Sequence, residues 1–195
     1  MLDTETGGLD LEKDQILTLD AVYLERAKGT SVWGKMGAPF HAKVAVPAFM
    51  GANHPSPEAL KVNRINMLTW KGDTETKVVH NLVRWVKAVA GKNYIIMCGY
   101  NSDSFDRPRL EAMFERARVR WTEAFSYKSM DVQGLVLWAK VMGLLELPHR
   151  TRLVDVAKEL DCYDDNAHDS AVDVAMTIEV MNRILAKAGQ GELFS

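Results

Sequence analysis

The chain has 195 residues, of which 47% are hydrophobic, and its 24 basic and 26 acidic side chains give a formal charge of −2. This length and composition are typical of one globular domain. The near balance of charge argues against a protein that coats long nucleic acid through its net charge alone. Two unpatterned cysteines and the lack of an apolar run of about 18 residues lead us to expect a cytoplasmic protein with no membrane partner.

The first half of the chain predicts two strands and two helices. Residues 16–24 are rich in β-forming side chains and predict a strand, and a second strand is expected over residues 43–46. Ser56 followed by Pro57 predicts the start of a short helix, and the apolar spacing of residues 74–90 predicts a longer one. Four turn-forming residues between the two strands indicate loops: Gly29, Gly34, Gly37 and Pro39.

The second half of the chain mixes strands and helices. The apolar run over residues 94–98 is typical of a fully buried strand, and a helical pattern follows at about residues 110–118. A strand is expected over residues 126–132, with a helix directly after it. Two further helices are predicted over residues 153–160 and 170–188. This order predicts an α/β fold in which helices cover both faces of a mixed sheet.

The first motif that could form a functional site is Asp3-Thr4-Glu5. On an extended strand, residues two apart point to the same face, so the two carboxylates would project together. Like charges at that separation repel unless a cation lies between them, and Mg²⁺ and Mn²⁺ prefer such oxygen ligands. Gly7 and Gly8 would let the backbone approach a ligand closely. Taken alone, this motif is more often a strand that ends in a solvated acidic turn.

A second acidic segment, Asn101-Ser-Asp-Ser-Phe105-Asp106, follows the predicted strand at residues 94–98. Catalytic groups are often carried by a loop at the end of a rigid strand. Asp106 would lie near the start of a helix, where the helix dipole favours a carboxylate. Asp103 is an equally suitable helix cap, so the residue types alone leave both aspartates open.

The third segment is His168-Asp-Ser-Ala-Val-Asp173, which leads into the last predicted helix. Asp173 adjoins the apolar stripe of that helix instead of its polar face. A carboxylate in such a position requires a partner or a metal ion. His168 precedes this helix and could lie on a loop beside the same site, although a lone histidine is more often a surface group.

Together the three segments resemble the DEDDh 3′→5′ exonucleases, whose fold is similar to that of ribonuclease H. Asp3 and Glu5 match the Asp-x-Glu of the first family motif, within Asp-Thr-Glu-Thr-Gly-Gly-Leu. Asp106 matches the aspartate of the second motif. The spacing His-x4-Asp of the third motif is matched by His168 and Asp173. The resemblance extends over nearly the whole chain and implies one exonuclease domain, residues 1–195, with a mixed five-stranded sheet flanked by helices.

Two details of the resemblance concern the choice of substrate and the length of the first strand. The spacing from Asn101 to Asp106, with Pro108 close behind, is most similar to three-prime repair exonucleases and to exonuclease domains of B-family DNA polymerases. This favours DNA as the substrate. Only Met1 and Leu2 precede the first aspartate, whereas most family members place a longer apolar strand there.

The resemblance implies a two-metal-ion phosphodiester hydrolase that acts at a nucleic acid 3′ end, most readily that of single-stranded DNA. His168 would be the general base on the attacking water, a task suited to an ordinary histidine pKa of about 6.5. The ligands of two Mg²⁺ or Mn²⁺ ions would be Asp3, Glu5, Asp106 and Asp173. Residues expected to contact the terminal nucleotide are Thr6, Gly7, Gly8, Leu9, Asn101 and Phe105.

Several alternatives stay open from the sequence. A 3′ exonuclease of the same type could act on short RNA. The pair His168-Asp169 also matches HD-type phosphohydrolases, although the predicted strands argue against that all-helical class. A third alternative is a catalytically degenerate module that only binds nucleic acid. The protein could also act as a homodimer or beside a polymerase. Two basic clusters offer phosphate contacts: Arg107, Arg109, Arg116, Arg118 and Arg120, and His149, Arg150 and Arg152.

Overall fold

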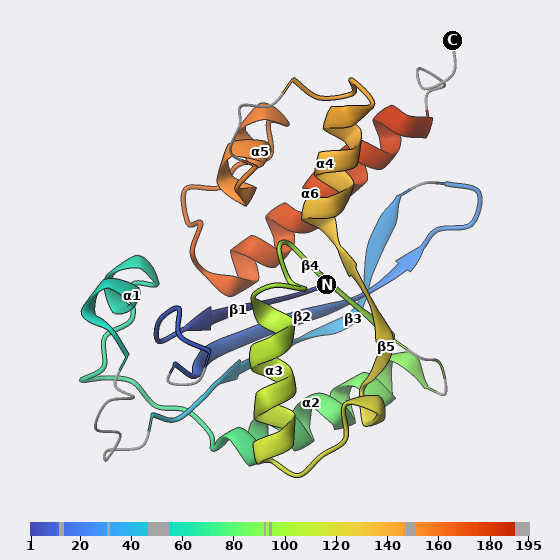
Figure 1. The fold of residues 1–195 in the computed structure, drawn as a ribbon. Helices are drawn as coiled ribbons and strands as arrows, with labels where there is room; N and C mark the ends of the chain where they lie inside the picture. Colours follow the sequence, from blue (N-terminus) through green and yellow to red (C-terminus); the bar gives the residue numbers. More distant parts are fainter. Residues whose placement is uncertain are drawn as a thin grey trace.

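The structure is a computed structural model that describes residues 1–11, 14–30, 32–46, 55–91, 93, 95–146 and 151–189 (Figure 1). Its elements in chain order are β1 (Leu2–Thr6), β2 (Ile16–Arg26), β3 (Trp33–Lys43), α1 (Pro57–Val62), α2 (Glu75–Ala90), β4 (Ile95–Gly99), α3 (Asp106–Arg116), the 3-10 helix η2 (Trp121–Glu123), β5 (Phe125–Asp131), α4 (Val132–Val141), α5 (Leu153–Glu159) and α6 (Ser170–Gly189).

Five strands form the centre of the described structure, and the expected mixed α/β fold is confirmed. Strand β2 pairs antiparallel with both β1 and β3, while β4 pairs parallel with β5. Strand β4 ends beside the start of β1, because a Cβ on Gly99 would come within 2.7 Å of the Leu2 carbonyl oxygen. Only glycine fits such a close approach of two backbones without a shift.

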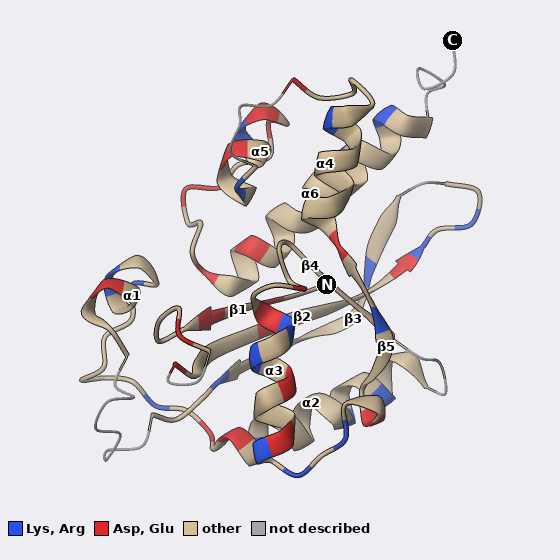
Figure 2. Cartoon of the chain, viewed as in Figure 1, with Lys and Arg blue, Asp and Glu red and all other residues tan. Residues whose placement is uncertain are grey.

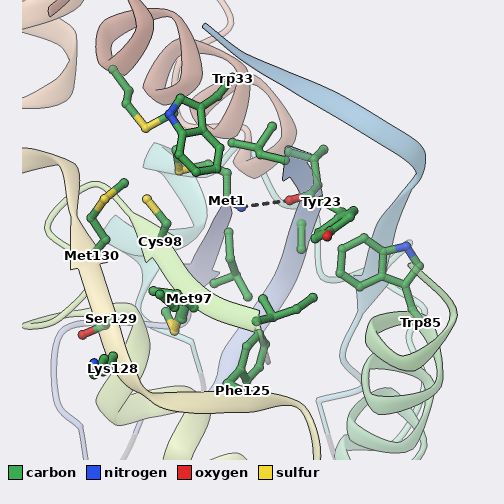
Figure 3. Close-up of a pocket in the computed structure, with 17 residues that line it drawn as sticks. Met1, Tyr23, Trp33, Trp85, Met97, Cys98, Phe125, Lys128, Ser129 and Met130 are labelled. Atoms are coloured by element: carbon green, nitrogen blue, oxygen red, sulfur yellow. Dashed lines mark hydrogen bonds between the residues drawn. The ribbon is translucent and has the colours of Figure 1, made fainter. Parts of the chain in front are cut away.

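The strands form two hydrogen-bonded sheets, β1-β2-β3 and β4-β5, instead of one continuous ladder. An apolar groove of about 480 Å³ lies between them, walled by β2 on one side and by β4 and β5 on the other (Figure 3). Leu24, Met97 and Met130 are among its lining residues. The amino group of Met1 lies at the groove and donates to the Val22 carbonyl oxygen at 2.8 Å.

Helices cover both faces of the strands, as predicted (Figure 1). Helices α4, α5 and α6 contribute Val136, Val156 and Met181 to one buried cluster. Helices α2 and α3 contribute Leu82 and Phe114 to a second cluster on the other face. Helix α6 also packs directly against β1 and β2, which brings the C-terminal part of the chain to the first strand. Within the described ranges, no helix has the length and apolar character to span a membrane.

Strand β3 corrects the prediction of a strand at residues 43–46, because it ends at Lys43 and includes Gly34, Gly37 and Pro39. These residues were predicted to form turns. Strand β3 lies at the edge of its sheet, where proline is tolerated. Gly37 has a positive φ of 71° and falls where the β2–β3 register shifts, so it belongs to a bulge instead of a turn.

Two smaller expectations about the second half of the chain are also wrong. Strand β4 is not fully buried, because the side chain of Ile96 is 51% exposed at the apolar groove. Helix α3 begins at Asp106, before the helical pattern expected over residues 110–118, although the expectation that Asp106 lies near a helix start is confirmed. Pro108 is compatible with this earlier start because the first turn of a helix has no intrahelical use for its amide hydrogens. The other predicted helices are confirmed to within one or two residues.

Candidate active site

Strand β1 presents Asp3 and Glu5 on one face of its sheet. Burial alternates along the strand, so Leu2, Thr4 and Thr6 are buried while the two acidic residues are only partly covered. This is the alternation expected for a strand with one face on the core. The strand therefore holds two carboxylates side by side on a rigid element.

Helix α6 brings a third carboxylate to the same place. The side chain of Asp169 caps the helix, with Oδ1 accepting from the Ala171 amide at 3.0 Å. Asp173 follows in the first turn, and one oxygen each of Asp3, Glu5 and Asp173 lies within 4.8 Å of the others. In Figure 2, acidic residues appear on β1 and near the starts of α3 and α6. The sheet and two helices thus converge on one acidic centre.

Asp106 is held against the back of β1. Its side chain is almost fully buried, and Oδ1 accepts hydrogen bonds from the Thr4 amide at 3.0 Å and the Thr4 hydroxyl at 2.6 Å. Among the neighbouring carboxylates, Asp106 has the largest effect in raising the pKa of Asp3. Asp103 is exposed, and its amide donates to Asp131 at 3.2 Å. Of the two aspartates that the sequence left open, the structure therefore brings Asp106 to the acidic centre.

Burial raises the carboxyl pKa values of all four acids, and repulsion by neighbouring carboxylates adds to it at Asp3, Glu5 and Asp173. Burial and then the charge of Asp173 raise the pKa of Glu5 to about 8. Burial raises the pKa of Asp106 to about 7, even though its hydrogen bonds from Thr4 act in the opposite direction. The pKa values of Asp3 and Asp173 are raised as well, mainly by burial. A divalent cation would reverse these shifts, and clustered carboxylate oxygens are the donors that Mg²⁺ and Mn²⁺ favour.

His168 lies beside this centre on the loop before α6. Its backbone has a positive φ of 72°, and its amide donates to Asp173 Oδ1 at 3.3 Å. The residue is exposed and lines a polar cavity of about 510 Å³ together with Glu5. The fixed backbone and exposed ring leave the imidazole able to approach a ligand at the carboxylates.

The loop after β1 packs closely against other parts of the protein at its two glycines. The Thr6 hydroxyl donates to the Gly8 carbonyl oxygen at 2.7 Å, and the Gly7 amide donates to Gln15 at 2.9 Å. A Cβ on Gly8 would overlap the carboxylate of Asp14. Leu9, at the tip, is 84% exposed. The loop therefore presents the apolar side chain of Leu9 close to a tightly fixed backbone.

Arg109 joins this loop to the second motif, so it is neither an exposed phosphate contact nor part of a solvated helix face. Its guanidinium donates to the carbonyl oxygens of Leu9 at 2.7 Å and Phe105 at 3.0 Å, and lies 3.9 Å from the centre of the Phe105 ring. Only 6% of Arg109 is exposed. Arg109 thus fixes both Leu9 and Phe105, two of the predicted nucleotide contacts.

Three of the other predicted phosphate contacts form ion pairs within the protein. Arg107 pairs with Glu111 at 2.8 Å, and Arg116 pairs with Glu75 at 2.7 Å. Arg152 pairs with Asp155 in the same way. His149 and Arg150 lie outside the described residues. An acid four residues after Arg107 is a sequence signal for the first of these pairs.

Asp131 positions the second motif although it was not among the predicted site residues. It ends β5, and its carboxylate accepts from the amides of Asn101 at 2.8 Å, Asp103 at 3.2 Å and Gln133 at 2.9 Å. Asn101 has a positive φ of 55°, which turns the chain out of β4. Asp131 therefore stabilises the turn that leads to Asp106.

Comparison with known proteins gives the family. The sequence matches the family model RNase_T, described as an exonuclease family, over residues 1–181. The chain belongs to the RNase_T exonuclease family. Its ribonuclease H-like α/β fold agrees with this membership, and the five strands exclude the all-helical HD-type alternative. A comparison with curated proteins gave no significant match.

Solved structures of exonuclease I have the same fold as this RNase_T family member. E. coli Exonuclease I in complex with a dT13 oligonucleotide has a TM-score of 0.77 and 19% identity, covering 97% of this chain and 40% of that chain. The zinc-bound form of an E. coli ExoI–ssDNA complex has a TM-score of 0.73 and 20% identity, covering 99% and 41%. A moderately thermophilic Exonuclease I from Methylocaldum szegediense has a TM-score of 0.70 and 20% identity, with the same coverages. The chain spans about two fifths of the length of these proteins.

Proposed function

We propose that the chain is a metal-dependent 3′→5′ exonuclease of the DEDDh type that acts on single-stranded DNA. The grouping of Asp3, Glu5 and Asp173, with oxygens within 4.8 Å of one another, carries this proposal. Asp106 and His168 border the group from two further elements. DNA is the proposed substrate because exonuclease I structures of the same fold are complexes with dT13 and with single-stranded DNA.

The acidic centre would hold two divalent cations. Their ligands would come from Asp3, Glu5 and Asp173, whose oxygens lie within 4.8 Å of one another, and from Asp106, which is hydrogen-bonded to the intervening Thr4. When bound, Mg²⁺ or Mn²⁺ ions supply positive charge that offsets the charge developing on the phosphate during displacement. The hydrogen bonds from Thr4 favour the charged form of Asp106 and keep its carboxylate oriented toward β1.

His168 would accept the proton of the attacking water. Its backbone is fixed through Asp173, and its ring is exposed in the cavity that Glu5 also lines. The water oxygen forms a bond to phosphorus, and the bond from phosphorus to the 3′-oxygen of the preceding nucleotide breaks. That oxygen takes up a proton and becomes the new 3′-hydroxyl group. The released product is a nucleoside 5′-monophosphate.

The loop after β1 would position the last nucleotide. Leu9 is exposed enough to pack beside the terminal base, and Phe105 offers an aromatic surface on the adjoining motif. Arg109 holds both residues through its hydrogen bonds to their carbonyl oxygens. Such fixed contacts would hold the scissile phosphate in the geometry needed for attack, so that less orientational entropy is lost in reaching the transition state.

The test is a comparison of 3′-labelled single-stranded DNA, duplex DNA and short RNA, each with Mg²⁺ and with Mn²⁺. We expect stepwise release of mononucleotides, fastest from single-stranded DNA, and none after chelation of the metal. Asp3→Asn and His168→Ala should each lower kcat/KM at least about a hundredfold, because several kcal/mol of transition-state stabilisation are removed. Full activity in either variant would contradict the assignment. Binding of DNA without any cleavage would support a degenerate binding module instead.

A further inference from the structure

The polar surface around the acidic centre continues sideways across the sheet. In the strand register, Asp3 lies opposite Asp20, which lies opposite His41. Residues directly opposite one another on neighbouring strands project to the same face. His41 therefore shares the face of the acidic centre, and two strand spacings, about 10 Å in total, separate the backbones of Asp3 and His41.

A second row of polar residues runs parallel to the first. Glu5 lies opposite Thr18, which lies opposite Lys43. The residues of β3 that alternate with His41 and Lys43, namely Phe40 and Ala42, pack into the hydrophobic cluster on the opposite face. The two rows therefore end in a pair of basic side chains, two residues apart on an edge strand, at the far side of the polar cavity.

His41 is oriented by a buried carboxylate. Asp20 accepts from His41 Nδ1 at 2.9 Å, and its own side chain is 8% exposed, whereas that of His41 is 54% exposed. Ser170 donates to the other oxygen of Asp20 at 2.6 Å. Because Ser170 contacts the carboxylate and not the imidazole, these residues are not arranged as a nucleophile with its base. They fix the ring so that Nε2 is left without a hydrogen-bond partner among the described residues.

The side chain of Lys43, two residues after His41, is held in place by a contact with the Trp70 ring. Its ammonium lies 5.1 Å from the centre of the Trp70 ring, and the Trp70 indole nitrogen donates to the Val44 carbonyl oxygen at 2.9 Å. Within the described residues, Lys43 forms no ion pair with a carboxylate. Arg64 borders the same cavity and donates to the Asp165 carbonyl oxygen at 3.3 Å. The far side of the cavity is thus a preformed group of hydrogen-bond donors. The carboxylate of Asp20 on this side already accepts hydrogen bonds from His41 and Ser170.

We propose that His41 and Lys43 form a phosphate-binding subsite for the backbone of the strand being degraded. A phosphodiester is the ligand that fits, because hydrogen-bond donors lie at one side of the cavity and a cation-binding acidic centre at the other. One phosphate would lie at Asp3 and Glu5, and a neighbouring phosphate of the same strand at His41 and Lys43. This inference rests on the proposed function, since it assigns a nucleic acid to the same cavity.

The salt dependence of binding tests the subsite without relying on cleavage. The wild-type protein, Lys43→Ala and the control Lys35→Ala would be titrated with fluorescent oligothymidylate in EDTA at several salt concentrations. Lys35 lies on the same strand but outside the polar cavity. For single strands, each lost phosphate contact reduces the slope of log affinity against log salt by about 0.7. We expect that reduction, with about tenfold weaker binding, for Lys43→Ala only. An unchanged slope and affinity for Lys43→Ala would overturn the proposal.

A comparison of substrates supplies the second readout. Thymidine 5′-p-nitrophenyl phosphate contains one phosphodiester, whereas oligothymidylate contains several. For His41→Ala, we expect kcat/KM on the oligonucleotide to fall about tenfold more than kcat/KM on the single diester. Equal losses on both substrates would overturn the subsite while leaving the exonuclease assignment intact. If the wild-type protein cleaves neither substrate, the assignment fails, and the binding titration alone decides the subsite.

Discussion

Strand β2 borders two cavities of similar volume and opposite character. Its Thr18 and Asp20 line the polar cavity of about 510 Å³, which also contains Glu5 and His168. Its Val22 and Leu24 line the apolar groove of about 480 Å³ between the two sheets. Volume alone therefore does not identify the candidate active site. The two cavities differ in the chemical character of the side chains that line them.

The polar cavity concentrates like charges that a folded protein would otherwise separate. Burial and repulsion by neighbouring carboxylates raise the pKa values of Glu5, which lines the cavity, and of Asp3 on the same face of β1, so the charged forms of both are disfavoured without a cation. The groove exposes apolar area, which is common on protein surfaces and carries no chemistry of its own. Perturbed carboxylates in a cavity are the stronger indication of function.

The largest contrast is expected within the second motif, between Asp106 and Asp103. Asp106→Asn should lower kcat/KM at least about a hundredfold, because it removes one of the charges that would bind the cations. Asp103→Asn is the matched control, since Asp103 is exposed and contacts the acidic centre through no hydrogen bond. Steady-state rates on oligothymidylate give both values. A large loss for Asp103→Asn with little for Asp106→Asn would reverse the assignment.

A smaller effect is expected in the stability of the metal-free protein. The folded pKa of Glu5, about 8, lies above the ordinary value of 4.5, so the folded state binds a proton that the unfolded state has lost. This contribution is complete below about pH 4 and is lost as pH rises through 8, amounting to a few kcal/mol at most. Urea unfolding in EDTA between pH 5 and 8.5 should therefore show decreasing stability.

Two comparisons separate this effect from general alkaline destabilisation. Glu5→Gln should flatten the pH dependence, whereas Glu159→Gln, at an exposed position on α5, should keep it. Saturating Mg²⁺ should oppose the decrease, because metal binding requires deprotonated carboxylates. The same slope in wild type and Glu5→Gln would show that Glu5 does not titrate as its burial indicates.

The parts of the site that sequence could predict are those set by local pattern. The acidic residues of β1 follow from strand alternation, and α6 follows from its apolar period. Residue types alone could not choose between Asp106 and Asp103, because both are good caps, and only the resemblance to a family motif favoured Asp106. The contact of Asp106 with Thr4, 102 residues away in the sequence, is what distinguishes the two in the fold. The Asp20–His41 pair likewise depends on the strand register, in a region where the predicted strand was misplaced.

The smallest effect is expected in the apolar groove, at Ile96. Its side chain is 51% exposed and lies on β4, away from the residues that line the polar cavity. Ile96→Ser should leave kcat/KM within about twofold of wild type and change the free energy of unfolding by no more than about 0.5 kcal/mol, as for other surface substitutions. Rates on oligothymidylate and urea unfolding measure both. A loss of oligonucleotide affinity comparable to that of Lys43→Ala would place the DNA strand along the groove, because an apolar side chain affects nucleic acid binding through direct contact, above all with the bases.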